Sequence, residues 1–131
     1  MPDAPPSGSP TILAVDDDRM VLHLLQAVLR SAGYSVLTAD SGWDAIRAYE
    51  AASAPIQLLL TDVIMPDLTG PVLAERLRSR QPDLQVLFIS GFHDADMVQH
   101  FVNARGFSLL PKPFTPDGLL REVRHTLAPT G

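Results

Sequence analysis

Three short polar stretches of this 131-residue chain carry the residue types that metal and phosphate chemistry require. The acidic run Asp16 to Asp18, the single Asp62 and the single Lys112 each follow an apolar, strand-like segment. Two carboxylates roughly 4 Å apart repel each other by about 4 kcal/mol at an effective dielectric near 20, so a carboxylate cluster favours a neutralising cation. All-oxygen ligation suits Mg²⁺. The pattern therefore indicates magnesium-dependent phosphoryl chemistry, provided that the fold brings these stretches together.

Each stretch also has an ordinary structural explanation. Asp16 to Asp18 could cap a helix, because Asp is favoured at the N-cap and in the first turn. Asp62 could be a turn residue after a strand, and Lys112 a solvated charge in a loop. Only the joint placement of the three stretches is specific, so the interpretation depends on the elements that position them.

Five short apolar segments alternate with amphipathic segments along the chain. Near-continuous hydrophobicity is typical of strands that are buried on both faces. The predicted strands are Thr11 to Val15, Tyr34 to Ala39, Ile56 to Thr61, Leu84 to Ile89 and Phe107 to Leu110. The apolar residues with helical spacing between and after them are Met20, Val21, Leu24, Leu25 and Val28, then Ala45, Ile46 and Tyr49, then Leu73 and Leu77, then Val98, Phe101 and Val102, then Leu119, Leu120, Val123 and Leu127.

This order of elements predicts an α/β protein with a doubly wound (βα)5, flavodoxin-like fold. Its five-stranded parallel sheet should run in the order 2-1-3-4-5, with helices on both faces. Helix start and stop signals agree with this prediction. Ser41 with Asp44 resembles a capping box, Thr115 before Pro116 is typical of a helix start, and Gly33 is placed to end the first helix.

Ligands of such sheets bind beyond the carboxyl ends of the strands, where every one of the polar stretches lies. Asp16 and Asp17 follow the first predicted strand and Asp62 follows the third, and these two strands are neighbours in the predicted order. The three carboxylates should therefore converge. Ser90 ends the fourth strand and Lys112 leaves the fifth, so a hydroxyl and an ammonium should face the same site.

Composition limits the classes of function. The chain has no Cys, which excludes disulfides and thiolate metal sites. A net charge of −5 at pH 7, with scattered Lys and Arg, disfavours direct binding of nucleic acid. Its apolar runs fall far short of the roughly 20 residues that a membrane span needs, so a cytoplasmic location and no membrane contact are expected. Residues 1–10 are expected to form a flexible tail and residues 11–128 a single domain, with no output domain.

Five motifs in this order carry a resemblance to a known family: Val15-Asp16-Asp17-Asp18, Asp62 with Met65-Pro66, Thr69-Gly70, Ser90-Gly91 and Lys112-Pro113-Phe114. From Thr11 to about Leu127 the chain resembles the receiver domain of two-component response regulators. The family is a standard example of the strand order 2-1-3-4-5, so the resemblance and the predicted order are not independent.

The resemblance implies a role for each residue of the predicted site. Asp62 would be the phosphoacceptor and would attack a phosphohistidine. Asp17 and Asp62 would bind Mg²⁺ directly, Asp16 largely through water, and the backbone carbonyl of Ile64 would complete the protein ligands. The remaining catalytic residues, Ser90 and Lys112, would bind the phosphoryl oxygens. Such a domain catalyses only its own phosphorylation and dephosphorylation, so it is not expected to be an enzyme for other substrates.

Two positions depart from the usual family pattern. Family members often have an aromatic residue three positions before the Lys, where this chain has Leu109. The usual aromatic readout of phosphorylation is therefore not expected. Ile64 and Phe92 flank the place where attacking water would approach, and neither side chain can orient water by a hydrogen bond. This predicts a long-lived acyl phosphate.

The partner implied by the resemblance is a sensor histidine kinase or a histidine phosphotransfer protein. The docking surface is expected on one face of the first helix, at Asp18, Arg19, Leu22, His23 and Gln26. The buried stripe of that helix is expected at Val21, Leu24, Leu25 and Val28. The signal would leave towards an unidentified downstream protein through a helix from Asp94 to Arg105, the strand through Leu109 and the last helix. The chain is expected to be a monomer or a weak dimer.

Alternative functions differ in what they demand of the chain. A phosphorelay intermediate and a receiver excised from a hybrid histidine kinase would use the same site. A Mg²⁺-dependent aspartyl phosphatase would place its nucleophile in an Asp-x-Asp pattern, which Asp16 to Asp18 contains, but the chain is too short for a substrate-binding cap. An FMN protein is disfavoured because three aspartates after the first strand would repel a phosphate. Trp43 and Tyr49 are expected to be partly buried in the core rather than to stack on a ligand.

Overall fold

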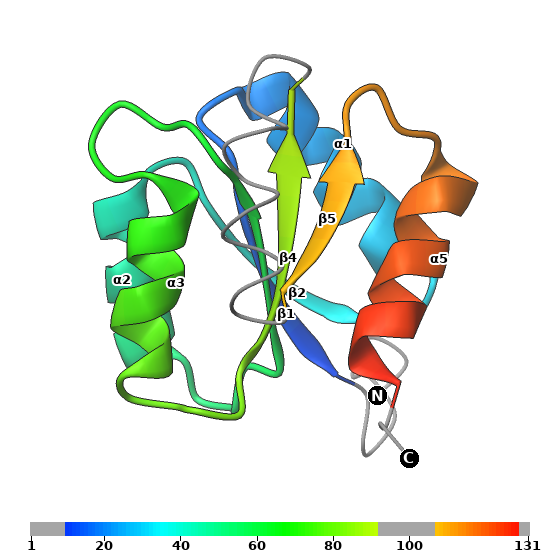
Figure 1. Ribbon diagram of the computed structural model, residues 1–131. Coiled ribbons are helices and arrows are strands. Elements are labelled where there is room, and N and C mark those ends of the chain that lie inside the picture. The colour runs from blue at the N-terminus through cyan, green and yellow to red at the C-terminus, as the bar shows by residue number, and fades with distance from the viewer. Residues whose placement is uncertain (1–9, 92–106, 129–131) are drawn as a thin grey trace.

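The structure is a computed structural model of the chain, and it describes residues 10–91 and 107–128. Five parallel strands form a sheet in the order β2-β1-β3-β4-β5 (Figure 1). The strands are β1 (Thr11–Val15), β2 (Ser35–Ala39), β3 (Leu58–Asp62), β4 (Gln85–Ser90) and β5 (Ser108–Pro111). The predicted order and the parallel pairing are both confirmed, with strand ends that differ from the prediction by at most two residues.

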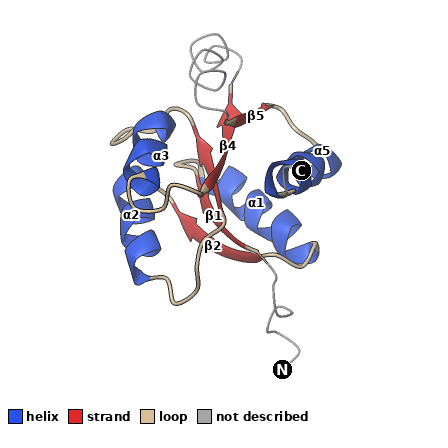
Figure 2. Cartoon of the chain, turned by 60° about the horizontal axis from the view of Figure 1, so that its bottom comes forward, coloured by secondary structure: helices blue, strands red, loops and turns tan. Residues whose placement is uncertain are grey.

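Helices cover both faces of the sheet. The described helices are α1 (Arg19–Ser31), α2 (Gly42–Ala51), α3 (Gly70–Arg78) and α5 (Pro116–Leu127). In Figures 1 and 2, α2 and α3 lie on one side of the sheet, and α1 and α5 lie on the other. The helix expected from Asp94 to Arg105 lies outside the described residues, as do residues 1–9 of the tail expected over residues 1–10. None of the helices that the structure describes is long and apolar enough to cross a membrane.

The core consists of two apolar layers, one on each face of the sheet. Leu13 and Val15 of β1 pack in the layer under α2 and α3, whereas Ile12 and Ala14 pack in the layer under α1 and α5. All five residues of β1 are buried. Strand residues alternate between the two faces, so burial of both faces requires the near-continuous hydrophobicity that the sequence shows.

The buried face of α1 differs from the predicted one. Leu25 and Leu29 are fully buried, and Leu22 is half-buried against the layer under α1 and α5. Leu24, which was expected in the buried stripe, is 44% exposed, and Met20, which only fits the helical spacing, is 83% exposed. Each residue turns the helix by about 100°, so a shift of one position moves a residue out of a stripe of this width. The expected burial of Leu24 was wrong.

Local capping follows the predicted signals. The backbone N–H of Asp44 donates to Ser41 Oγ at 3.1 Å, and that of Gly118 donates to Thr115 Oγ1 at 2.9 Å. Gly33 follows α1 with a φ of 96°, a conformation that glycine adopts without steric cost. Its N–H donates to the Arg30 carbonyl at 3.0 Å, which closes the helix end. These caps set where α1 stops and where α2 and α5 begin.

The two aromatic residues of α2 differ in burial. Tyr49 is half-buried against the layer under α2 and α3, and its hydroxyl donates to Gln81 Oε1 at 2.8 Å. Trp43 is 44% exposed and packs in neither core layer, so the partial burial in the core expected for it was wrong. Its ring instead lies beneath the guanidinium of Arg76, with 5.1 Å from the guanidinium carbon to the ring centroid. Trp43 therefore belongs to the surface of the α2–α3 layer.

Candidate functional site

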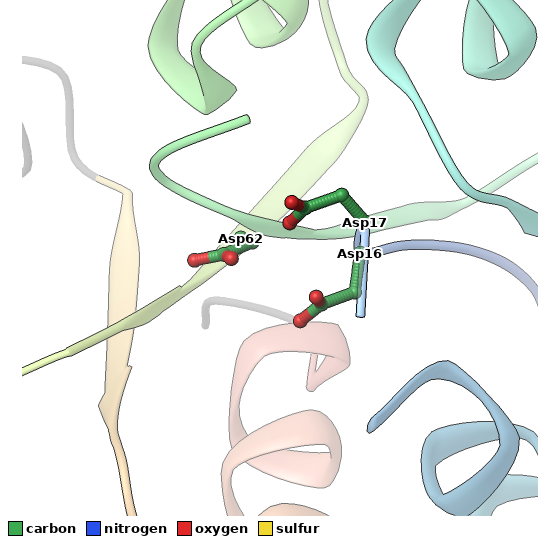
Figure 3. A group of neighbouring side chains, drawn as sticks. All are labelled: Asp16, Asp17 and Asp62. Atoms are coloured by element: carbon green, nitrogen blue, oxygen red, sulfur yellow. The ribbon is translucent and has the colours of Figure 1, made fainter. Parts of the chain in front are cut away.

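The carboxyl ends of β1 and β3 bring three carboxylates together. Val15 pairs with Thr61 in the register of these neighbouring strands, so the residues that follow, Asp16 and Asp62, lie next to each other. One carboxylate oxygen each from Asp16, Asp17 and Asp62 lies within 4.8 Å of the other two (Figure 3). The convergence predicted from the strand order is confirmed.

The three carboxylates differ in how far they are buried. Asp16 is completely buried, Asp62 is 8% exposed and Asp17 is exposed. Asp16 Oδ1 accepts the backbone N–H of Asp18 at 2.8 Å. Asp16 Oδ2 is buried and has no hydrogen-bond partner among the described residues. This oxygen, which accepts no hydrogen bond, forms with the two neighbouring carboxylates a ligand set that suits a cation preferring oxygen. These residues could therefore hold a metal ion.

Lys112 brings the positive charge of the described site. Its Nζ lies 3.5 Å from Asp16 Oδ2 and 3.5 Å from Asp62 Oδ2, so it forms an ion pair with both buried acids. The backbone N–H of Lys112 donates to the Ser90 carbonyl at 2.8 Å, which ties the end of β5 to β4. The peptide bond from Lys112 to Pro113 is cis. One ammonium lies beside a cluster of three carboxylates, so the negative charge of the described site is not fully neutralised.

Burial and mutual repulsion shift the acidity of these groups. Burial raises the pKa of Asp62 to about 6; the charge of Asp16 adds to this rise and that of Lys112 opposes it. Burial likewise raises the pKa of Asp16. Burial by itself would lower the pKa of Lys112, but the charges of Asp16 and Asp62 outweigh that effect, so its pKa is raised. The ammonium is held firmly, whereas the two buried acids ionise at an energetic cost that a second cation would offset.

The other predicted site residues lie around this cluster. Ser90 is buried at the end of β4, one residue beyond Ile89, which pairs with Asp62. Its hydroxyl donates to the Gly91 carbonyl at 3.0 Å. Ile64 lies two residues after Asp62 and is 45% exposed. Phe92, which was expected to flank the site with Ile64, lies outside the described residues.

Four of the five predicted docking residues share a groove of about 440 Å³ between α1, the end of β2 and the start of α2: Arg19, Leu22, His23 and Gln26. Arg19 also forms an ion pair with Asp40, with 2.9 Å between Nη2 and Oδ2. Asp18, the fifth, instead caps α1 by accepting the backbone N–H groups of Met20 and Val21.

One residue near the site was not singled out from the sequence. Asp67, in the loop between β3 and α3, accepts backbone N–H groups from Gly42, Trp43 and Leu68 at 3.0, 2.9 and 2.9 Å. These hydrogen bonds, that of Trp43 first, lower the pKa of Asp67. Two of the three donors lie 24 and 25 residues away along the chain, on α2. No local pattern shows such a contact, because an aspartate in a loop is ordinary.

The fold and the site define an α/β protein with an acidic, lysine-bearing site at the carboxyl edge of a parallel sheet. The family model of the response regulator receiver domain matches residues 12–124. The response regulator receiver protein CpdR of Brucella abortus is 36% identical over 117 residues, which cover 88% of this chain and 95% of CpdR. The chain therefore belongs to the response regulator receiver domain family of two-component signalling.

Other relatives and solved structures agree with this membership. The sensor kinase CckA of Brucella abortus is 34% identical over 92% of this chain, which spans 13% of the length of CckA. A crystal structure of the chemotaxis protein CheY4 of Vibrio cholerae has a TM-score of 0.82 at 27% identity, covering 92% of this chain and all of that one. A receiver domain from Clostridium thermocellum has a TM-score of 0.83 at 26% identity, with 90% and 94% covered. The sheet order and helix placement are thus those of a receiver domain.

Proposed function

We propose that this receiver domain accepts a phosphoryl group on Asp62 from a histidine kinase or a histidine phosphotransfer protein. The observation that carries the proposal is the position of the Asp62 carboxylate, which lies within 4.8 Å of two further carboxylates and 3.5 Å from Lys112 Nζ. An oxygen of Asp62 would attack phosphorus while the phosphorus–nitrogen bond to the donor histidine breaks. The bonding electrons stay with the imidazole nitrogen, and an acyl phosphate forms.

Burial and access favour Asp62 over its neighbours as the nucleophile. Asp16 is fully buried, and one of its oxygens already accepts the Asp18 N–H. Asp62 keeps some access to solvent and lies beside the Lys112 ammonium, which can neutralise the phosphoryl oxygens. Asp17 is exposed at the rim, where it can act as a metal ligand. Ser90 ends the neighbouring strand, from which its hydroxyl can donate to the phosphoryl group.

Mg²⁺ is the cation that we propose for this site. Asp17, Asp62 and the Ile64 carbonyl would hold it directly, and Asp16 largely through water. When bound, the ion neutralises the carboxylates and the charge that develops on the phosphoryl oxygens. The buried Asp16 Oδ2, which accepts no hydrogen bond and has the Lys112 ammonium only at ion-pair distance, supports this set.

The proposed docking surface for the donor is the exposed face of α1 together with its groove. Arg19, His23 and Gln26 supply the polar contacts. Leu22 is half-buried, so its apolar contribution is smaller than the sequence suggested. Met20 and Leu24 supply the exposed apolar surface of the helix instead. An amphipathic surface of this kind fits a partner that presents helices.

A relay role is a second candidate that one observation favours. The chain is 34% identical to a segment of a sensor kinase, so it could equally act as the receiver of a hybrid kinase or as an intermediate that returns the phosphoryl group to another histidine. Transfer of the label from the phosphorylated chain to a histidine phosphotransfer protein would distinguish relay from a terminal switch. On either route, the half-buried Leu109 stands where family members often have the aromatic residue whose rotation reports phosphorylation. The output partner therefore recognises another part of the surface.

The decisive test is phosphorylation by acetyl phosphate and Mg²⁺, followed by intact mass. The wild-type chain should gain one phosphoryl group, Asp62→Asn should gain none, and chelation of the metal should abolish the gain. Asp18→Asn is the matched control, because Asp18 belongs to the acidic run but not to the carboxylate cluster. A phosphorylated Asp62→Asn protein would contradict the assignment of the nucleophile. A folded wild-type protein that gains nothing from acetyl phosphate or a kinase would contradict the proposed function.

A further inference from the structure

The loop between β3 and α3 leaves the site directly after Asp62, and its far end returns against the same residue. The backbone N–H of Gly70 donates to the Val63 carbonyl at 2.7 Å. A Cβ atom at position 70 would lie 2.4 Å from the Asp62 carbonyl oxygen, far inside contact distance. Only a glycine lets the start of α3 approach the backbone of Asp62 so closely. This closes the loop at its base.

The tip of the same loop is attached to the first turn of α2. Asp67 Oδ1 accepts the N–H groups of Gly42 and Leu68, and Oδ2 accepts that of Trp43. The Leu68 side chain packs on Gly42 so closely that a Cβ atom there would lie 2.6 Å from Leu68 Cβ. Both a charged and an apolar contact therefore fix the tip of the loop against a helix that supplies none of the carboxylates.

Between these two attachments, the side chains alternate between core and solvent. Val63 and Met65 are buried, whereas Ile64 and Pro66 are exposed. The buried side chains set the depth of the loop relative to the sheet. The position of the loop relative to α2 depends on the contacts that its tip makes with that helix.

We propose that Asp67 is a positioning residue that holds the loop on α2 and thereby keeps the backbone after Asp62 in the place where it completes the metal site. This inference rests on the proposed function, in which the Ile64 carbonyl is a metal ligand. Hydrogen bonds outside the ligand shell fix the direction of ligands, and their loss costs about 10- to 100-fold in metal affinity. Asp67 acts through the loop and does not itself touch the metal or the phosphoryl group.

The test compares two variants that weaken the same helix end in different ways. Asp67→Ala removes the three hydrogen bonds of the loop. Ser41→Ala removes the cap that α2 receives from its own N-terminal residue and leaves the Asp67 contacts in place. Each should lower Tm by a few degrees. Only Asp67→Ala should weaken Mg²⁺ binding, by about tenfold in calorimetric titration, and only it should speed amide hydrogen exchange over residues 62–70.

The dependence of phosphorylation on Mg²⁺ separates positioning from general loss of structure. For Asp67→Ala, half-maximal phosphorylation should require about tenfold more Mg²⁺, and the rate at saturating Mg²⁺ should return close to the wild-type rate. Asp67→Asn keeps one oxygen that can accept from Gly42 and Leu68, so it should lie between the two. Gly42→Ala, which pushes on Leu68 while Asp67 remains, should reproduce the defect of Asp67→Ala.

The outcomes distinguish this inference from the proposed function. Equal Mg²⁺ affinity of wild type and Asp67→Ala, or equal weakening in Asp67→Ala and Ser41→Ala, would overturn the positioning role. A wild-type chain that binds Mg²⁺ but takes no phosphoryl group would overturn the proposed function alone. Calorimetry and hydrogen exchange would still test the positioning role of Asp67, because neither requires phosphorylation. If Asp67→Ala does not fold, the same two measurements on Asp67→Asn and Gly42→Ala decide, and wild-type values in both would overturn the inference.

Discussion

Aspartates in two regions of this molecule have opposite environments. Asp18 and Asp67 are exposed and accept backbone N–H groups from the first turns of α1 and α2, and these bonds lower the pKa of Asp67. At the sheet edge, Asp16 and Asp62 are buried beside each other, and burial raises the pKa of both. The first kind of carboxylate is stabilised by donors that the fold supplies. The second kind lacks enough donors and depends on cations.

This difference between the two kinds of carboxylate shows which part of the molecule lowers the free energy of unfolding. A carboxylate at a helix start satisfies N–H groups that the helix leaves without partners, so it favours folding. A buried cluster of carboxylates opposes folding unless positive charge compensates it. Lys112 compensates part of the charge at the sheet edge. The remaining cost identifies the place where binding of a cation and transfer of an anionic group can release the most free energy.

The largest effect on stability should come from Asp62→Asn in the absence of divalent cations. The pKa of Asp62 is about 6, against 3.8 for an ordinary aspartate, and its side chain is 11% exposed. At pH 7 this difference corresponds to about 2 to 3 kcal/mol of lost folding free energy. The variant, which carries no charge at this position, should therefore be more stable by up to that amount in urea denaturation at pH 7.

The pH dependence of this effect has a definite sign. Between about pH 4 and pH 6 the native Asp62 keeps its proton and the unfolded one releases it, so the wild type loses stability as pH rises through that range. The gain from Asp62→Asn should therefore disappear near pH 4. An Asp62→Asn protein that is less stable than the wild type at pH 7, or a gain that is equal at pH 4 and pH 7, would show that the buried cluster is not destabilising.

Mg²⁺ should remove part of the same cost, with a smaller effect. A ligand that binds only the native state at ten times its Kd stabilises it by about 1.4 kcal/mol. The wild-type free energy of unfolding at pH 7 should rise by that amount, and that of Asp62→Asn by much less. Asp18→Asn, whose carboxylate lies outside the cluster, should respond like the wild type. An equal rise in Asp62→Asn would place the cation elsewhere.

The sheet-edge region was predictable from the sequence, and the physical reason is simple. Parallel strands end at a common edge, so residues directly after neighbouring strands must converge whatever their exact ends. Asp16 and Asp62 needed only the strand order. An error of two residues at the start of β3 did not affect the prediction, because the polar residue itself marks where the strand stops.

The helix surfaces were less predictable, because they depend on angle rather than on order. Met20 and Leu24 fit an apolar stripe by spacing, but the face of α1 that meets the sheet is centred on Leu25 and Leu29. Trp43 was expected to be partly buried in the core because it lies in the helical pattern of α2, whereas its ring lies under Arg76 at the surface. Such details follow from how helices pack on the sheet, which a single sequence does not specify.

The contacts of Asp67 depend on tertiary structure in the same way, and they supply the smallest of the expected effects. Asp67→Ala should destabilise the protein by about 1 kcal/mol at pH 7, because three N–H groups lose an acceptor and two of them belong to the first turn of α2. The sign is opposite to that of Asp62→Asn. Since the pKa of Asp67 is lowered on folding, its contribution is present above the ordinary aspartate value and is lost as pH falls through the lowered one. On acidification, the difference in free energy of unfolding between wild type and Asp67→Ala should therefore shrink. The difference between Asp62→Asn and wild type should also shrink on acidification, but because the native Asp62 then gains the proton that its raised pKa favours. Urea denaturation of both variants at pH 7 and pH 3.5 measures the two signs side by side, and a shared sign at pH 7 would remove the contrast between the two kinds of carboxylate.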